Sequence, residues 1–143
     1  MIQLKELLAK KGAGAVTVPE SSTVGMAIRT MCQHRVGSVV VPSTSGAAVG
    51  IFTERDVMHL YAEGKTDFEN LLVKDCMTTD PVLGNPDDRI SDVLAIMTEK
   101  RFRHMPVVQD NRIVGIVSIG DLVKVKLEET AREAQVLREY ITS

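Results

Sequence analysis

The sequence has no tryptophan and few other aromatic side chains, three Phe and two Tyr among 143 residues. Single-stranded nucleic acids are commonly bound by stacking bases on aromatic side chains, and nucleic-acid-binding surfaces are usually basic. Because the formal net charge is −2, we do not expect nucleic-acid binding.

No apolar run approaches the roughly 20 residues of a membrane span, and the charged, amphipathic N-terminal stretch does not resemble a signal peptide. We expect a cytoplasmic protein without a membrane segment.

Cysteine is also scarce. Cys32 and Cys76 are the only two, and neither lies in a Cys-x-x-Cys or His-x-x-x-His pattern. We therefore expect neither a disulfide nor a metal site, and we predict that both thiols are small buried hydrophobes in a reduced protein. The motifs of the common enzyme classes are missing too: no Walker loop, no Gly-x-Ser-x-Gly and no His-Glu-x-x-His. The sequence thus indicates a protein that is not an enzyme.

What the chain does have is a duplicated motif. Gly50 to Asp56 and Gly115 to Asp121 both read Gly-apolar-apolar-(Ser/Thr)-x-x-Asp, at the end of a β-rich run and the start of a helical one. The hydroxyl can donate and accept, the carboxylate can accept from paired hydroxyls such as a ribose diol, and the helix start suits a phosphate. A second interpretation is that the hydroxyls merely cap helices, as such residues most often do. The duplication favours a binding site.

The repeat extends well beyond the motif, since Met31 matches Met97, Arg35 matches Arg101 and Val41 matches Val107. Each copy reads strand–helix–strand–strand–helix, and a unit this small should bury its sheet against its partner. The predicted fold class is α/β (α+β), two β-α-β-β-α units in a pseudo-twofold pair with clefts where they meet. The predicted segments are an N-terminal helix (1–14), unit 1 (15–64), a connector (65–79), unit 2 (80–125) and a C-terminal helix (126–143).

The C-terminal segment carries an apolar stripe outside the repeat. Its members recur at helical spacing and are Leu127, Ala131, Ala134, Leu137 and Ile141. Such a stripe needs a cover, which could be the N-terminal helix or a second copy of the chain. We favour a homodimer.

Two further segments accompany the motifs: Arg103-His104-Met105-Pro106-Val107, and the connector Val73-Lys74-Asp75-Cys76-Met77. Together with the two copies of the motif, and in this order along the chain, these segments make the chain resemble the tandem CBS-domain proteins (Bateman modules) of the small stand-alone type. The resemblance implies a regulatory module that binds an adenine nucleotide and signals to a partner protein. AMP is the first expectation, with ADP, ATP, NAD(H) and S-adenosylmethionine as alternatives. The competing interpretation is a structural dimerisation module that binds no nucleotide.

The resemblance also implies roles for individual residues. Asp56 and Asp121 would hold ribose hydroxyls, with Thr53 and Ser118 near the ribose and phosphate. Arg103 and His104, the basic residues that precede the Pro106-Val107 pair, would contact the phosphate. The adenine would be enclosed by residues of the first and middle strands: Thr17, Val18, Ser38 and Val39 in one unit, and Pro81, Val82, His104 and Met105 in the other.

The two copies differ in charge. Unit 2 has Arg103 and His104 where unit 1 has Gly37 and Ser38, whereas unit 1 has Arg55 near its motif where unit 2 has Gly120. A phosphate needs charge-assisted donors to replace its hydration. We therefore expect clefts of different affinity, one of which could stay empty, and the sequence leaves open which cleft gains Arg103. For the neighbouring Lys100 and Arg101, a solvated helix end is the alternative role.

Overall fold

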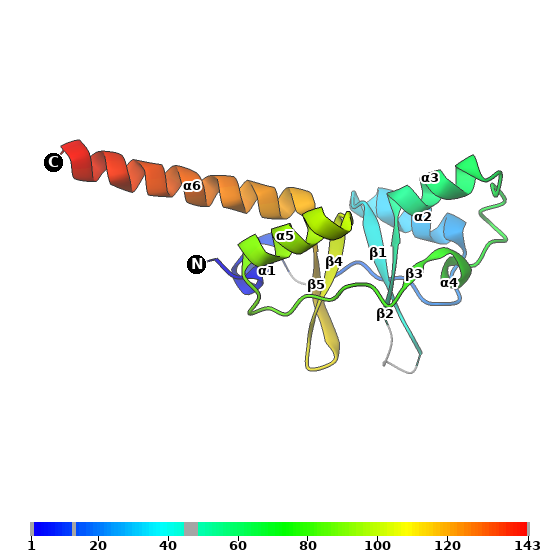
Figure 1. The fold of residues 1–143 in the computed structure, drawn as a ribbon. Coiled ribbons are helices and arrows are strands. Elements are labelled where there is room, and N and C mark those ends of the chain that lie inside the picture. Colours follow the sequence, from blue (N-terminus) through cyan, green and yellow to red (C-terminus); the bar gives the residue numbers. More distant parts are fainter. Residues whose placement is uncertain (1, 13, 45–48, 143) are drawn as a thin grey trace.

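The computed structural model describes residues 2–12, 14–44 and 49–142. Two small sheets stand side by side in the middle, with the helices of each unit on the outer sides (Figure 1). The elements of unit 1 and the connector are α2 (Val24–His34), β1 (Ser38–Pro42), β2 (Val49–Thr53), α3 (Glu54–Ala62), α4 (Val73–Cys76) and β3 (Thr78–Thr79). The others are α1 (Leu4–Lys11), α5 (Ile90–Lys100), β4 (His104–Gln109), β5 (Arg112–Ser118) and α6 (Ile119–Thr142).

Unit 1 is built around its own hydrophobic core. Thr23 caps α2 by accepting a hydrogen bond from the backbone N–H of Met26 at 3.1 Å, which fixes where the helix begins. The apolar face of α2 then packs against an antiparallel sheet in the order β1-β2-β3. Phe52, fully buried, is the largest side chain of this core.

Unit 2 repeats this arrangement with one addition. Its core joins α5, the antiparallel pair β4-β5 and the first turns of α6. Helix α1 belongs to the same core, because Leu4 and Leu7 are buried in it. The backbone N–H of Leu4 also donates to the carbonyl of Asp88 at 2.9 Å. The N-terminal helix therefore packs on the second unit, not on the first unit that follows it in the chain.

The sheets are buried on both faces near the middle of the molecule. Val39 and Val41 of β1 point into the core of unit 1, whereas Val40 between them is fully buried but outside that core. Pro106 of β4 is buried in the same alternating position. Because successive side chains of a strand point to opposite faces, these residues lie on the sheet faces that the two units turn towards each other.

The predicted first strand of each unit is much reduced. Around Thr17 and around Gly84, the structure has a single parallel bridge to the middle strand instead of a regular strand. Each stretch is joined to the middle strand by two backbone hydrogen bonds, which are made by Val40 in unit 1 and by Gly84 in unit 2. Too few residues pair for a regular strand to form.

The helix before each middle strand ends at an arginine in a left-handed conformation. Helix α2 ends at His34, and Arg35 follows it with φ 54°. Arg101 does the same after α5, with φ 58°. The repeat thus preserves an arginine at a backbone position that usually favours glycine.

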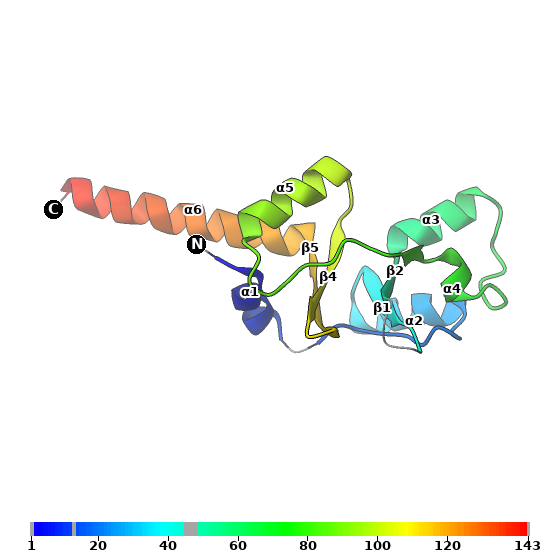
Figure 2. The ribbon, with the colours of Figure 1, turned by 60° about the horizontal axis from the view of Figure 1, so that its bottom comes forward.

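Residues on either side of the expected boundary at 125 and 126 belong to one helix, α6, of 24 residues. No Gly or Pro interrupts the chain between Asp121 and Thr142, so nothing ends the helix earlier. Leu122 and Val125 in its first turns are buried, and the remainder extends away from the body in both ribbon views (Figures 1 and 2).

Cys32 corrects one prediction, since it is exposed, and only Cys76 packs partly against the core of unit 1. Cys32 follows the buried Met31 on α2, and one helical step turns it to the solvent.

Within the described residues, no helix is long and apolar enough to cross a membrane.

Candidate functional site

A cleft of about 600 Å³ lies between the two units, next to the motif of unit 1. We call it the first cleft. One side is the start of α3, from Thr53 to Asp56, and the other is the segment before β4, from Arg101 to His104. Pro81 and Val82 of the reduced first strand of unit 2 also line it. Each unit therefore contributes one wall, as the predicted pseudo-twofold pairing requires.

The carboxylate of Asp56 is positioned by the helix start. The backbone N–H and the hydroxyl of Thr53 donate to Asp56 Oδ2 at 2.8 and 3.2 Å, and the Thr53 hydroxyl accepts from the N–H of Asp56 at 3.4 Å. This is a capping box. Thr53 is thus a helix cap, as the plainer interpretation proposed, and the same bonds fix the orientation of the carboxylate beside the cleft.

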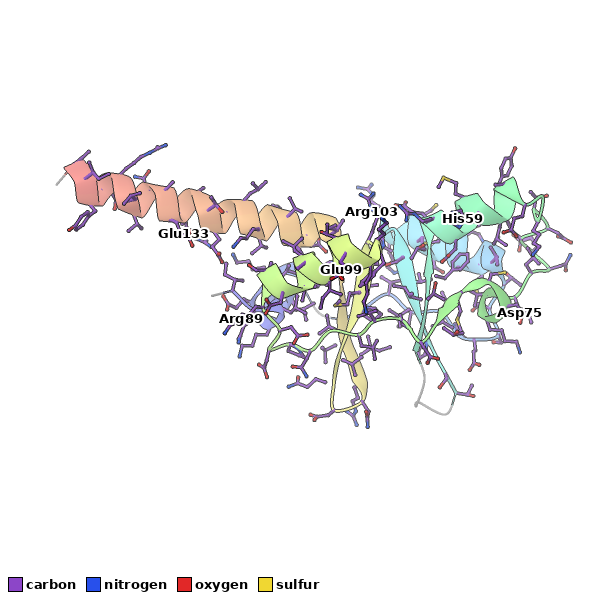
Figure 3. All side chains as sticks on the ribbon, viewed as in Figure 1. His59, Asp75, Arg89, Glu99, Arg103 and Glu133 are labelled. Carbon is purple, nitrogen blue, oxygen red and sulfur yellow. The ribbon has the colours of Figure 1, made fainter. Side chains whose placement is uncertain are left out.

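Three arginines surround the first cleft: Arg55, Arg101 and Arg103. In the part of the chain that the structure describes, none of the three forms a salt bridge. Arg103 comes from unit 2 and lies at the junction of the two units (Figure 3). Guanidinium groups without carboxylate partners suit a phosphate, which they can bind through two parallel hydrogen bonds.

The second cleft, of about 480 Å³, lies beside the motif of unit 2. The start of α6 with Ser118 and Asp121 forms one side, and the segment from Arg35 to Ser38 forms the other. The backbone N–H of Ser118 donates to Asp121 Oδ2 at 3.0 Å, and the Ser118 hydroxyl accepts from the N–H of Asp121 at 3.1 Å. The helix start is therefore built as in unit 1.

The second cleft differs from the first in one ion pair. Lys11, at the end of α1, donates from Nζ to Asp121 Oδ2 at 2.6 Å and to the carbonyl of Ile116 at 2.9 Å. Burial by itself would raise the pKa of Asp121, but the hydrogen bonds from Lys11 and Ser118 outweigh it and the pKa is lowered. The carboxylate is ionised and already compensated by a cation of the same chain.

His104 and Glu54 line both clefts. Gly37 makes room for them, because a Cβ at this position would lie 3.1 Å from Glu54 Oε1 and 3.4 Å from His104 Nε2. Burial lowers the pKa of His104 below its ordinary value, although the nearby Glu54 carboxylate acts in the opposite direction. The imidazole is therefore neutral at neutral pH unless an anion enters beside it.

The structure brings most of the predicted site residues to the clefts. The first cleft is lined by Thr53, Arg55, Asp56, Pro81, Val82, Arg103 and His104, and the second by Ser38, His104, Ser118 and Asp121. Five others line neither cleft. Val18, Val39 and Met105 are buried in the cores of their units, Pro106 is buried between the sheets, and Thr17 is exposed at its bridge.

Several lining residues were not among the predicted ones. Phe102 and Arg101 line the first cleft, and Glu54 lines both. An aromatic side chain between two arginines could have pointed to Phe102. Lys11 has no such signal, because only the packing of α1 on unit 2 brings it to Asp121.

Comparison with known proteins places these observations in a family. The sequence model of the CBS domain matches residues 8–63 and 73–128. The CBS domain-containing protein CBSX3, mitochondrial, of Arabidopsis thaliana is 33% identical over 147 residues, covering 96% of this chain and 71% of that protein.

Solved structures agree with this match. The CBS-domain containing protein ATU1752 from Agrobacterium tumefaciens has a TM-score of 0.81 and 38% identity, covering 87% of this chain and 99% of the other. A CBS domain protein from Pyrobaculum aerophilum complexed with AMP shares the fold, with a TM-score of 0.74 and 24% identity over 84% of this chain and 89% of the other. The chain belongs to the CBS-domain family and carries two CBS domains in tandem.

Proposed function

We propose that this chain is a regulatory module without catalytic activity that binds an adenine nucleotide, AMP first among the candidates, in the first cleft. One observation carries the proposal. The motif carboxylate of Asp56 shares a cleft of about 600 Å³ with three arginines, and among the described residues neither this carboxylate nor the arginines form a salt bridge. A nucleoside phosphate offers a diol for the carboxylate and an anion for the arginines.

The remaining walls of the cleft fit the base. Pro81, Val82 and Phe102 give the first cleft an apolar side, and binding sites of this size are commonly apolar with a few placed polar groups. The fold is shared with a CBS domain protein complexed with AMP, which supports the choice of AMP as the first ligand to test. ADP, ATP, NAD(H) and S-adenosylmethionine remain the alternatives.

Thermal unfolding tests the proposal. The wild type would be heated with and without millimolar AMP, ATP, NADH or S-adenosylmethionine, in parallel with Asp56→Asn and Asp110→Asn. A ligand that binds only the folded state raises stability by about 2.7 kcal/mol at a hundredfold excess over its Kd. We expect AMP to raise the melting temperature of the wild type and of Asp110→Asn, but not that of Asp56→Asn.

Asp110→Asn is the matched control because it makes the same chemical change in the β4–β5 turn, away from both clefts. Its φ is 53°, a conformation that asparagine tolerates well. A melting temperature that none of the four compounds changes would overturn the nucleotide proposal. A shift that persists in Asp56→Asn would place the ligand elsewhere.

A regulatory module must pass the effect of ligand binding on to another protein. We propose that nucleotide in a cleft lined by both units favours one arrangement of the pair, and that a partner protein in the cytoplasm detects the difference. Nucleotide-dependent co-purification from the source cells, compared between wild type and Asp56→Asn, would test this step.

A specific observation favours a second function, assembly with another copy of the chain. Beyond the body, α6 exposes Leu127, Leu137 and Ile141, whose exposed fractions are 66%, 59% and 72%. Leu127, Ala134 and Ile141 recur every seven residues with Leu137 between them, which is the pattern of a coiled-coil seam. Helix α1 packs against the first turns of α6, in the core that contains Leu122 and Val125. We propose a homodimer in which two such helices cover each other.

Light scattering after gel filtration tests the dimer. We expect the mass of a dimer for the wild type and a monomer for Leu137→Glu, because a charge in an apolar seam is costly to bury. Gln135→Glu introduces the same charge on a different face of the helix and should leave the dimer intact. A dimer that survives Leu137→Glu would contradict the proposed seam.

A further inference from the structure

The glycine that opens each motif is covered by a side chain from outside its own repeat. A Cβ at Gly115 would lie 2.5 Å from Leu8 Cδ2 of α1, and a Cβ at Gly50 would collide with the Met77 side chain after α4. Helix α1 therefore occupies, over the motif of unit 2, the place that the α4 segment occupies over the motif of unit 1.

These two covering segments place different residues at their clefts. The segment over Gly50 contributes Thr78 to the first cleft, whereas α1 contributes Lys11 to the second. Thr78 carries no charge, and within the described residues Asp56 forms no salt bridge. Lys11 carries a positive charge, and its Nζ lies 2.6 Å from Asp121 Oδ2.

The ammonium group of Lys11 is held in this position by hydrogen bonds. It donates to two acceptors, Asp121 Oδ2 and the carbonyl of Ile116. The helix that carries it is fixed by Leu4 and Leu7, which are buried in the core of unit 2. Asp121 Oδ2 already accepts from the ammonium of Lys11 and from the backbone N–H of Ser118. A diol that donates to both oxygens of the Asp121 carboxylate would therefore have to displace the ammonium and break this ion pair.

We propose that Lys11 determines which cleft accepts nucleotide: it occupies the motif carboxylate of the second cleft and confines the ligand to the first. This inference rests on the proposed nucleotide binding. The distribution of arginines agrees with this role, since the three arginines that form no salt bridge among the described residues line the cleft whose motif carboxylate is not paired with a lysine.

Titration calorimetry with AMP on the full chain tests the inference. Lys11→Met removes the charge and keeps an aliphatic side chain. Lys11→Gln also removes the charge but leaves a polar group at the end of the side chain. We expect one AMP per chain for the wild type and two for either variant. In the double variant Lys11→Met/Asp56→Asn, one AMP should remain, bound in the second cleft.

Two controls accompany these variants. Lys10→Met makes the same change one residue earlier, at an exposed position of α1 that lines neither cleft. Lys11→Arg keeps a cation at Asp121. Both should bind one AMP, as the wild type does, and circular dichroism should show that every variant is folded.

The possible results separate the two proposals. Two AMP per wild-type chain, an unchanged stoichiometry in both Lys11→Met and Lys11→Gln, or loss of binding in them would overturn the role of Lys11. If the wild type binds no AMP but both variants bind one, the proposed function of the first cleft fails while the role of Lys11 stands. If no variant binds AMP, both proposals fall.

Discussion

At the scale of single residues, the motif hydroxyls serve the fold and the proposed site with the same bonds. Thr53 and Ser118 each cap a helix, and the reciprocal bond from each backbone N–H orients the motif carboxylate. Capping and ligand binding are therefore not competing interpretations. The chemical difference between the clefts arises from neighbours of these residues, above all from Lys11 and from the arginines of the first cleft.

His104 should make stability depend on pH. Burial lowers its pKa in the folded protein, so the unfolded chain, with a His pKa of about 6.5, binds the proton more readily. Stability should be unaffected well above that value and should fall as the pH drops through it towards the folded pKa. Urea unfolding between about pH 7.5 and about pH 5 should show a weaker loss in His104→Asn than in the wild type.

His59→Asn, on α3, is the control for this experiment, because His59 is exposed. It should follow the wild-type profile. If His104→Asn loses as much stability over this interval as the wild type does, the burial of His104 does not govern the effect.

The left-handed arginines should respond differently to glycine. Arg35 and Arg101 have φ values of 54° and 58°, a conformation that costs an L-residue roughly 1–2 kcal/mol and costs glycine little. Arg35→Gly and Arg101→Gly should each raise the free energy of unfolding, by about 1 kcal/mol at most after the entropy of the unfolded glycine is counted.

Only one of the two replacements should change the affinity for AMP. Arg101 lines the first cleft and Arg35 the second, so Arg101→Gly should weaken AMP binding and Arg35→Gly should not. Calorimetry on both variants checks this, and equal losses of affinity would contradict the assignment of AMP to the first cleft.

At the scale of elements, the two terminal helices lie outside the repeat but have different roles. Helix α1 completes the core of unit 2 and delivers Lys11 to the second cleft. Helix α6 continues the repeat through Leu122 and Val125 and then exposes its apolar residues. One terminal helix is thus part of the folded body, whereas the other exposes the apolar side chains of the proposed dimer seam.

Helix α1 should contribute directly to stability. Leu4 is fully buried in the core of unit 2, so Leu4→Ala should cost about 2–5 kcal/mol through lost burial and the cavity that remains. Leu83→Ala removes the same atoms from a side chain that is 47% exposed and should cost far less. Urea unfolding measures both, and comparable costs would show that α1 is not an integral part of the core.

At the scale of the whole molecule, two separate cores meet through their sheets, and the clefts form where they meet. Neither unit contains a complete first cleft, because Asp56 belongs to one unit and Arg103 to the other. A ligand that contacts both walls must link the units. This is the physical basis on which nucleotide could change the arrangement of the pair.

Hydrogen exchange should detect this link. AMP should slow amide exchange at residues 53–56 and at residues 101–104 together, because both walls of the first cleft become ordered by one ligand. Asp56→Asn should lose protection at both segments, while Asp110→Asn should keep it. Protection confined to one of the two segments would contradict a ligand that bridges the units.

The sequence by itself determined the repeat and its consequences. Residues that recur in one order, from Met31 and Met97 to Asp56 and Asp121, predicted two similar units, and alternating or helical spacing predicted most of their elements, because burial requires that periodicity. The motif chemistry also predicted that the hydroxyls and carboxylates of the two motifs would lie at the clefts, whereas five of the residues implied by the family resemblance line neither cleft. The first strands were overestimated, since local apolar character does not reveal how many residues of a stretch pair with the middle strand.

The tertiary structure alone decided how the two clefts differ. Nothing near Asp121 in the sequence indicates that Lys11 pairs with it, because that contact joins residues far apart and depends on the side of the molecule on which α1 packs. Likewise, only the meeting of the two units assigns Arg103 to the cleft of Asp56. Local sequence specifies the parts of a site, whereas the partners of its charges are set by packing over distances that periodicity does not encode.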